Sequence, residues 1–462
     1  MRATVRDQTM PARKMRPFDP QCGPQFDHHV QMQGISKIHR LWAAIFVIAV
    51  ASDVLSGAIR YYTSLVGLAP LGYLPKALMV VALGFALVER PKASHVLIIT
   101  YLGAQMCVSL ANGIPLSAAL FWIWTVSPML FALVMPPQAL EVLESPRMLA
   151  VLVGLTLLAV GGVFLNYFVH LPWVGGSVDI GGGVSVTIAK ATYVGTASRL
   201  PGFGRSSAST GLLIGLLVTW IFPRLRSRAA VTAILALSAL AIWKTTNKTT
   251  LVALVIVVGL HLMLRTRSLR TASIALSALI VALPIAGWLI TLASIQDISS
   301  SGSLSSMQDR FFNTWPMLIE GMVREHLIWL GVGPGGFGSS VGFGSAVGNG
   351  ATGFGFNTGY ADNMALYTLA NVGVIGNVFL IAAFVHFVLS RESNNRPIWL
   401  MLCFLLASGL TTDIYETTGC LLFFGVVLNS ISQRVPRPRI SSARIAFERL
   451  QSNVRGTASG LH

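Results

Sequence analysis

About twelve apolar segments follow one another along this chain, and they limit its possible folds more than any other feature. A helix needs roughly 20 apolar residues to cross the hydrocarbon core of a bilayer. Hydrophobic residues make up 53% of the 462-residue chain and charged residues only 11%, against roughly 25% charged residues in a soluble domain. We therefore expect an all-α polytopic membrane protein, with spans near 41–57, 73–88, 94–112, 115–136, 148–170, 208–222, 229–243, 249–264, 271–293, 361–389, 397–411 and 417–433.

Basic residues gather in four of the segments that flank or connect these apolar runs. The N-terminal segment 1–40 and the tail 434–462 are basic, and the turns 223–228 and 265–270 hold three arginines each. With twelve spans all four lie on one side, and the positive-inside rule makes that side the cytoplasm. Both termini are then cytoplasmic, and most of the net charge of +16 serves contact with anionic membrane lipid rather than nucleic acid.

The expected order has nine transmembrane helices within 41–293, one large loop at 294–360 on the outer face, and three more helices within 361–433. The outer face also receives the shorter segments 57–72 and 171–207. The scattered cysteines show no spacing typical of a metal site or a disulfide framework, and we expect them to be small packing residues; they are Cys22, Cys107, Cys403 and Cys420.

The outer face carries more positive charge than such a face normally does. Arg60 lies between a helix end and two tyrosines, Arg199 and Arg205 flank a Gly/Pro loop, and Lys248 belongs to the short turn KTTNKTT. If these groups converge, they form a cationic cavity that suits a diphosphate, because the arginine fork binds phosphate oxygens bidentately. The simpler expectation, snorkelling to headgroups or pairing with a nearby carboxylate, applies to Lys76, Lys190 and Arg324.

The large outer loop begins with an amphipathic stretch and continues into glycine-rich sequence. Arg310 opens a predicted helix that would lie at the outer leaflet, with apolar residues at helical spacing: Phe311, Trp315, Leu318 and Met322. In the following GVGPGGFG, glycines allow close backbone approach, so that amides at Gly333, Gly335 and Gly336 can face an anionic ligand. A disordered low-complexity loop is the alternative.

The loop ends with Asp362 and Asn363, at the top of a long apolar segment. A carboxylate at the membrane boundary is costly unless it is paired or used in function. Capping of the following helix is the structural alternative for Asp362.

These motifs, taken in order, resemble the bacterial O-antigen ligase/polymerase family of membrane glycosyltransferases, with its polymerase branch the most similar. The family pattern is an Arg that opens a periplasmic helix, a Gly-x-Gly-x-Gly-(Gly)-Phe loop, a polar pair and a Gly-hydrophobic-hydrophobic-Gly turn. The corresponding residues here are Arg310, Gly331–Phe337, Asp362-Asn363 and Gly373–Gly376. KTTNKTT stands in place of a Ser-Arg turn, with Lys248 in the basic position. Asp362 stands where ligases commonly have His, which favours a polymerase.

The resemblance implies a GT-C-like, metal-independent enzyme of the bacterial inner membrane without a cofactor. It would transfer a glycan from undecaprenyl diphosphate to the terminal sugar of another lipid-linked repeat unit at the periplasmic face. A chain-length regulator would be a further protein partner. Fixed cations stabilise the departing diphosphate; we expect Arg199, Arg205 and Arg310 in this role, with Lys248 and Arg60 as second choices.

The attacking hydroxyl also needs a proton acceptor. Asp362 is the first candidate and Glu320 the second, with Asn363 either orienting the base or capping the helix. Trp315 and Tyr360 would stack on sugars, although aromatic residues at an interface commonly serve as anchors. The alternatives are an O-antigen ligase or O-oligosaccharyltransferase of the same family, and a flippase or transporter of lipid-linked sugars.

Overall fold

The computed structural model describes residues 37–89, 93–179, 185–194, 197–293, 305–343, 354, 356, 358–390 and 395–432. Several sequence predictions therefore fall outside the described residues. These are the basic character of 1–36 and 433–462, Cys22, and the parts of the large loop at 294–304 and 344–353.

The protein is largely helical, and a helix occupies each of the twelve apolar segments. Within the described residues, six helices are long and apolar enough to cross a membrane, or seven if the bent pair α1 (Lys37–Val54) and α2 (Ser56–Leu65) counts as one span. The six contain α3 (Leu74–Glu89), α5 (Leu116–Val134), α7 (Pro146–Phe168), α8 (Ser207–Ile221), α11 (Thr266–Leu292) and α14 (Met364–Ser390). Twelve crossings and a GT-C-like arrangement remain predictions.

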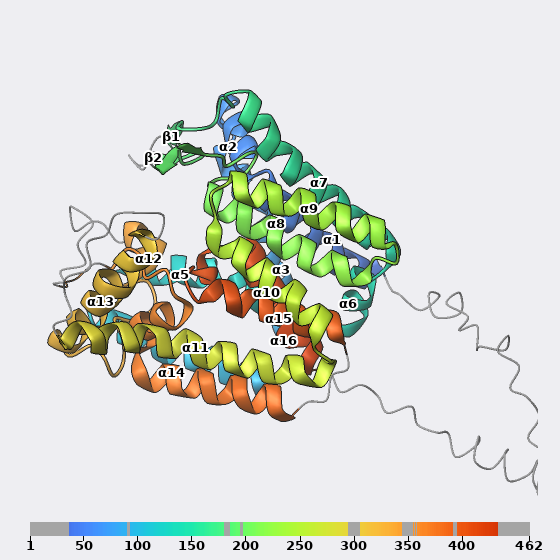
Figure 1. Ribbon diagram of the computed structural model, residues 1–462. Helices are drawn as coiled ribbons and strands as arrows, with labels where there is room; N and C mark the ends of the chain where they lie inside the picture. The colour runs from blue at the N-terminus through green and yellow to red at the C-terminus, as the bar shows by residue number, and fades with distance from the viewer. Residues whose placement is uncertain are drawn as a thin grey trace, which may run out of the picture.

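The remaining apolar segments form helices of a bundle seen in Figure 1. They are α4 (Ala93–Ala111), α9 (Arg228–Lys244), α10 (Lys248–Met263), α15 (Arg396–Gly409) and α16 (Thr418–Ser432). The helices α8, α15 and α16 are buried along most of their length, and the others surround them. Small residues permit this close packing: a Cβ atom on Gly215 of α8 would lie 2.7 Å from the Phe404 ring of α15.

The short elements lie between the long helices. The helical ones are η2 (Ala69–Tyr73), α6 (Pro137–Leu143), η3 (Phe222–Arg224), α12 (Ser305–Asp309), the π-helical turn η4 (Arg310–Thr314), α13 (Trp315–Arg324), η5 (Gly338–Phe343) and η7 (Ile414–Glu416). The all-α prediction missed two small antiparallel hairpins within 171–207, formed by β1 (Ser177–Asp179) with β2 (Ser185–Thr187) and β3 (Thr192–Val194) with β4 (Ala197–Arg199). Three-residue strands give too little alternation of polar and apolar residues to be recognised in a sequence.

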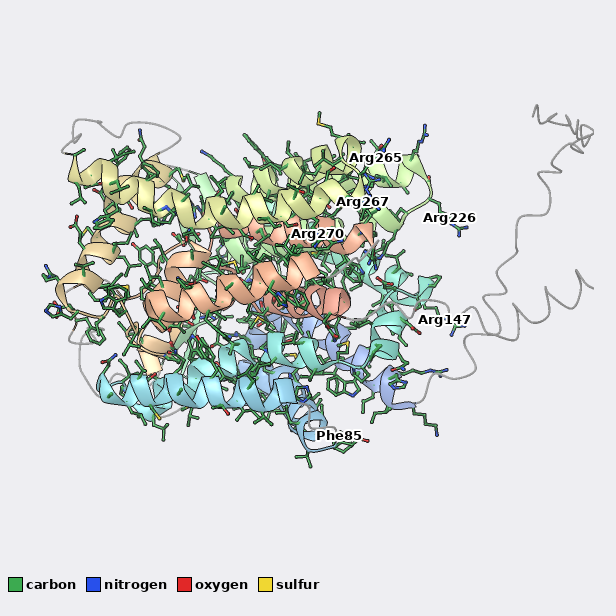
Figure 2. All side chains as sticks on the ribbon, turned by 90° about the horizontal axis from the view of Figure 1, so that it is seen from below. Phe85, Arg147, Arg226, Arg265, Arg267 and Arg270 are labelled. Atoms are coloured by element: carbon green, nitrogen blue, oxygen red, sulfur yellow. The ribbon has the colours of Figure 1, made fainter. Side chains whose placement is uncertain are left out.

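The arginine turns gather at one end of the bundle. Arg147, Arg226, Arg265 and Arg267 lie together there, whereas Phe85 of α3 marks an apolar flank (Figure 2). The long helix α11 starts beside these arginines and leads away from them, and α12 and α13 lie at the other end of the bundle (Figure 1). The predicted separation between the arginine turns and the segment that begins at Arg310 is therefore present in the fold.

Candidate active site

Arg310 and Asp362 form an ion pair at the end of the bundle that holds α12 and α13. The Arg310 Nε donates to Asp362 Oδ2 at 3.0 Å, and the Nη2 atom lies 2.9 Å from the same oxygen. Arg310 is the first residue of the π-helical turn, a type of helix distortion that is frequent at functional sites. Asp362 has a φ of 51°, which is uncommon for a residue other than glycine. Two residues that the sequence selected independently are thus held together in a partly exposed position.

The neighbours of Asp362 fix its backbone. Trp315 of α13 is fully buried, and its Nε1 donates to the Ala361 carbonyl at 2.9 Å. The amphipathic stretch is helical, but the helical residues begin at Ser305, before Arg310, and the apolar face of α13 packs against the protein. A fully buried Trp315 has no surface for stacking on a sugar, so it acts here as an anchor, whereas Tyr360 is 51% exposed.

Asn363 immediately precedes α14 and is completely buried. Its Oδ1 accepts from the backbone N–H groups of Ala365 and Leu366 at 2.9 and 3.0 Å, which makes it the helix cap in place of Asp362. Its Nδ2 donates to the carbonyls of Ile280 and Leu410, at 3.1 and 2.9 Å. One side chain therefore ties α14 to α11 and to the end of α15.

We expect Asn363→Asp to destabilise the protein although aspartate is an equally good helix cap. The substitution removes the donor to two buried carbonyls, and each buried group left unsatisfied costs about 1–3 kcal/mol. Thermal unfolding in detergent should show a lower midpoint for Asn363→Asp than for Asn395→Asp, in which the donor that is lost serves an exposed acceptor, Glu144 Oε1 at 3.3 Å, instead of two buried carbonyls. Equal midpoints for the two variants would contradict this account.

A second group of charges surrounds Asp53, beside the 82° bend between α1 and α2. The Asp53 Oδ2 accepts from the Gly419 N–H at 2.8 Å. Three cations are close enough to act electrostatically on this carboxylate: Lys76 of α3, Arg60 of α2 and Arg205 in the loop before α8. The Arg60 guanidinium also lies 5.7 Å from the centre of the Tyr73 ring. This group, extended by Lys190 and Glu416, is called the Asp53 cluster below.

Lys190 and Glu416 are exposed members of the Asp53 cluster. The Lys190 N–H donates to the Arg205 carbonyl at 2.8 Å, and both cations act on the Glu416 carboxylate. Four cations and two carboxylates are thus assembled from six separate parts of the chain, with positive charge in excess by two. Lys76, for which the sequence predicted pairing with a carboxylate or snorkelling, lies within electrostatic range of Asp53 and forms no ion pair among the described residues. Arg324 pairs with Glu325 at 3.5 Å as expected.

The turn η7 connects the Asp53 cluster with the Arg310–Asp362 pair. The ring of Tyr415 in η7 stacks on the ring of Tyr367 in α14, with centroids 5.5 Å apart, and Asp413, which caps η7, experiences the negative charges of both Asp362 and Glu416. Glu416 in turn accepts a hydrogen bond from the Ser339 N–H at the start of η5. The two groups of charges therefore belong to one polar region.

The remaining predicted cations lie in other surroundings. Lys248 opens α10 and lines a separate cavity of about 150 Å³ with Trp243 and Thr246. Arg199 ends β4, and its buried Nε has no hydrogen-bond partner among the described residues. Glu320 is an exposed residue of α13. The roles that the sequence analysis gave these three residues stay predictions.

The glycines of the GVGPGGFG loop pack against the chain's own helices. A Cβ atom on Gly333 would lie 2.5 Å from the Cα of Ser109 in α4, and one on Gly335 would lie 2.5 Å from the carbonyl carbon of Ala118 in α5. The Gly333 N–H donates to the Asn371 carbonyl at 3.1 Å, and the Gly336 N–H donates to the Gly333 carbonyl at 3.1 Å. These two amides are occupied and do not face an open anion site. Packing already requires glycine here, so a role in substrate binding remains a prediction.

Sequence reasoning missed the carboxylates that organise this region. Asp53 interrupts an apolar segment, and an ionisable residue at such a place is a functional candidate by default. This signal could have identified it. Asp413 and Glu416 stand in TTDIYETT between the last two apolar segments, where nothing in the sequence shows that they lie near Asp362 and Arg205.

The metal-ligating side chains do not form a cluster in the described part of the chain: no group of three or more His, Cys, Asp or Glu residues could hold an ion there. The charged groups of the site are the Arg310–Asp362 pair and the Asp53 cluster, in which cations outnumber carboxylates by two.

Comparisons with known proteins do not assign the chain. No protein-family model matches it, and no curated protein sequence matches it either.

Proposed function

We propose that the protein is a polysaccharide polymerase of the inner membrane. It would transfer a glycan from undecaprenyl diphosphate to the terminal sugar of another lipid-linked repeat unit at the periplasmic face. The observation that carries the proposal is the Asp53 cluster, with its excess of two positive charges, beside the Arg310–Asp362 pair. A diphosphate brings the complementary negative charge, and fixed cations stabilise it best as it departs.

The position of the cations supports transfer at the face opposite the arginine turns. The positive-inside rule would place those turns in the cytoplasm, so the Asp53 cluster and Arg310 would meet substrate from the outer leaflet. Arg205 and Lys190 are exposed, whereas Arg60 and Lys76 are partly buried. A lipid headgroup could therefore first meet the exposed cations at the membrane surface. Its phosphates would then reach the partly buried cations, which are less hydrated than exposed side chains.

The assignment of cations differs from the one predicted from the sequence. Arg205 and Arg60 stay in the diphosphate site, and Lys76 and Lys190 join them. Arg310 would act at the junction between the diphosphate and the sugar, oriented by Asp362. Guanidinium groups can bind phosphate oxygens in pairs, which ammonium groups cannot.

A deletion strain that carries plasmid variants tests this function. Arg205→Ala should reduce long-chain product by about 100-fold or more, the typical loss when one transition-state donor is removed. Arg226→Ala is the matched control, because this exposed arginine lies at the opposite end of the bundle (Figure 2) and should leave polymer length unchanged.

The location of the unused repeat units separates the proposal from transport. Single repeat units on the outer leaflet of the deletion strain support a polymerase, and their accumulation on the cytoplasmic leaflet would show a flippase instead. If polymer forms but is not attached to its final acceptor, the protein is a ligase.

A further inference from the structure

We propose that Asp413 is the proton acceptor of the transfer reaction and that it works as one member of a carboxylate pair with Glu416. This inference rests on the proposed glycan transfer and adds a residue to its machinery.

The geometry of η7 presents the two carboxylates together. Asp413 caps this 3₁₀ turn, with Oδ1 accepting from the Tyr415 N–H at 3.1 Å. Glu416 follows three residues later, and side chains three apart in a 3₁₀-helix lie on the same side. Within the described residues, the Oδ2 atom of Asp413 accepts no hydrogen bond. The cap therefore orients the carboxylate and leaves one oxygen for a substrate hydroxyl.

Asp413 lies where the two reacting groups would meet. Its turn packs against α14 through the stacked rings of Tyr415 and Tyr367. Asp362, which holds Arg310, and Glu416, on which Arg205 and Lys190 act, both contribute negative charge at Asp413. A glycan whose diphosphate is bound by the Asp53 cluster would thus present its anomeric carbon toward η7. Asp413 as a whole residue is partly exposed, so a hydroxyl can reach η7 although the carboxylate itself is poorly hydrated.

The surroundings favour Asp413 over Asp362 as the base. Arg310 compensates the charge of Asp362, whereas Asp413 forms no ion pair with any described residue. Burial, and then the neighbouring Glu416 carboxylate, raise the pKa of Asp413 well above its usual range. A carboxylate with a raised pKa accepts a proton more readily near neutral pH.

The other titratable groups around Asp413 are acidic. Glu416 and Tyr415 share its turn, Asp362 and Tyr367 face it from the region of α14, and Cys420 faces it from α16. A carboxylate with acidic neighbours and no direct cation binds a proton more tightly than an isolated one. Two close carboxylates also titrate as a pair, so that a change at Glu416 must alter the behaviour of Asp413.

The chemical step balances without a further reactant. The acceptor hydroxyl oxygen forms a bond to the anomeric carbon while the bond from that carbon to the diphosphate oxygen breaks. The bonding electron pair leaves with undecaprenyl diphosphate, which the cations stabilise. The hydroxyl proton passes to Asp413 Oδ2 and is later released to water.

The test uses the full-length protein in detergent, with lipid-linked repeat units extracted from the deletion strain as substrate. Asp413→Asn keeps the cap, because asparagine also offers an Oδ1 acceptor, but it cannot take a proton. We expect its rate of polymer formation to fall by about 100- to 10,000-fold, the usual contribution of a general base, with donor binding retained.

The Glu416→Gln variant provides a second measurement, which remains informative even if Asp413→Asn does not fold. Removing the neighbouring negative charge lowers the pKa of Asp413, so Asp413 stays deprotonated to a lower pH. The acid limb of the rate profile should therefore move to lower pH, which loss of a merely structural contact would not cause.

Two results would overturn the inference. One is Asp413→Asn polymerising within tenfold of the wild-type rate, and the other is an unmoved acid limb in Glu416→Gln. Failure of the proposed function is distinguishable from both, because the wild-type protein itself would then form no polymer from these substrates.

Discussion

Arg310→Ala and Asp362→Asn are each expected to leave lipid-linked repeat units unpolymerised in a strain that lacks the native gene. Arg310 contributes a guanidinium fixed by two contacts to Asp362 Oδ2. Because the pair is only partly exposed, the loss of Arg310 leaves a carboxylate without its compensating charge at the point where negative charge develops. A loss of about 100- to 1,000-fold in rate corresponds to the removal of one such preorganised donor.

A double-mutant cycle shows whether the two residues act as a unit. If Asp362 works by orienting Arg310, then the combination of Arg310→Ala with Asp362→Asn should be hardly worse than Arg310→Ala alone. Arg324→Ala is the matched control, because its arginine, on the same helical segment, pairs with Glu325 and has a side chain that is 65% exposed. Long-chain product from either single variant, at normal expression, would remove that residue from the mechanism.

The sequence predicted the helices well because lipid as a solvent leaves a strong signal. A span must satisfy its backbone internally and present apolar side chains, so each apolar segment became a helix. The number of crossings is harder to obtain. Helices such as α15 and α16 are short and enclosed by other helices, and their hydropathy does not reveal whether they traverse the bilayer.

The site was only partly predictable because its residues come from distant parts of the chain. Arg310 and Asp362 were both selected by local patterns, and the fold brings them together. Lys76 and Asp53 lie in apolar segments where pairing or snorkelling is the ordinary expectation, and only the folded chain shows that Lys76 and Arg205 both act on Asp53. Periodicity and spacing report on residues that are close along the chain. They therefore do not predict which distant segments come into contact.

The glycine-rich loop shows how one pattern can serve two physical purposes. Backbone exposed to an anion and backbone pressed against another helix both require the absence of a side chain. The loop also depends on donors from α4 and the turn after it: the Ser109 Oγ donates to the Pro334 carbonyl at 2.9 Å, and Asn112 Nδ2 donates to the Gly331 and Val332 carbonyls, both at 3.1 Å. These contacts favour the packing role, and a substitution can separate the two.

Gly333→Ala is expected to prevent normal folding rather than weaken substrate binding in a folded enzyme. Gly333 has a φ of +92°, and its new Cβ would lie 2.5 Å from both the Cα and the Oγ of Ser109. Backbone strain of this kind costs about 1–3 kcal/mol, and forcing an atom into a packed contact costs about 1–3 kcal/mol more. Together these are a large part of the 5–15 kcal/mol by which proteins are typically stable.

Gly103→Ala is the matched control, because Gly103 lies in the same helix as Ser109 and a Cβ there would meet nothing within 4 Å. Alanine in that helix should be neutral or stabilising, by up to about 1 kcal/mol. Size-exclusion profiles and thermal midpoints in detergent should therefore separate the two variants. If Gly333→Ala instead remains as stable as the wild type and loses only donor binding, its amide faces the substrate and the loop must open from the packed arrangement to do so.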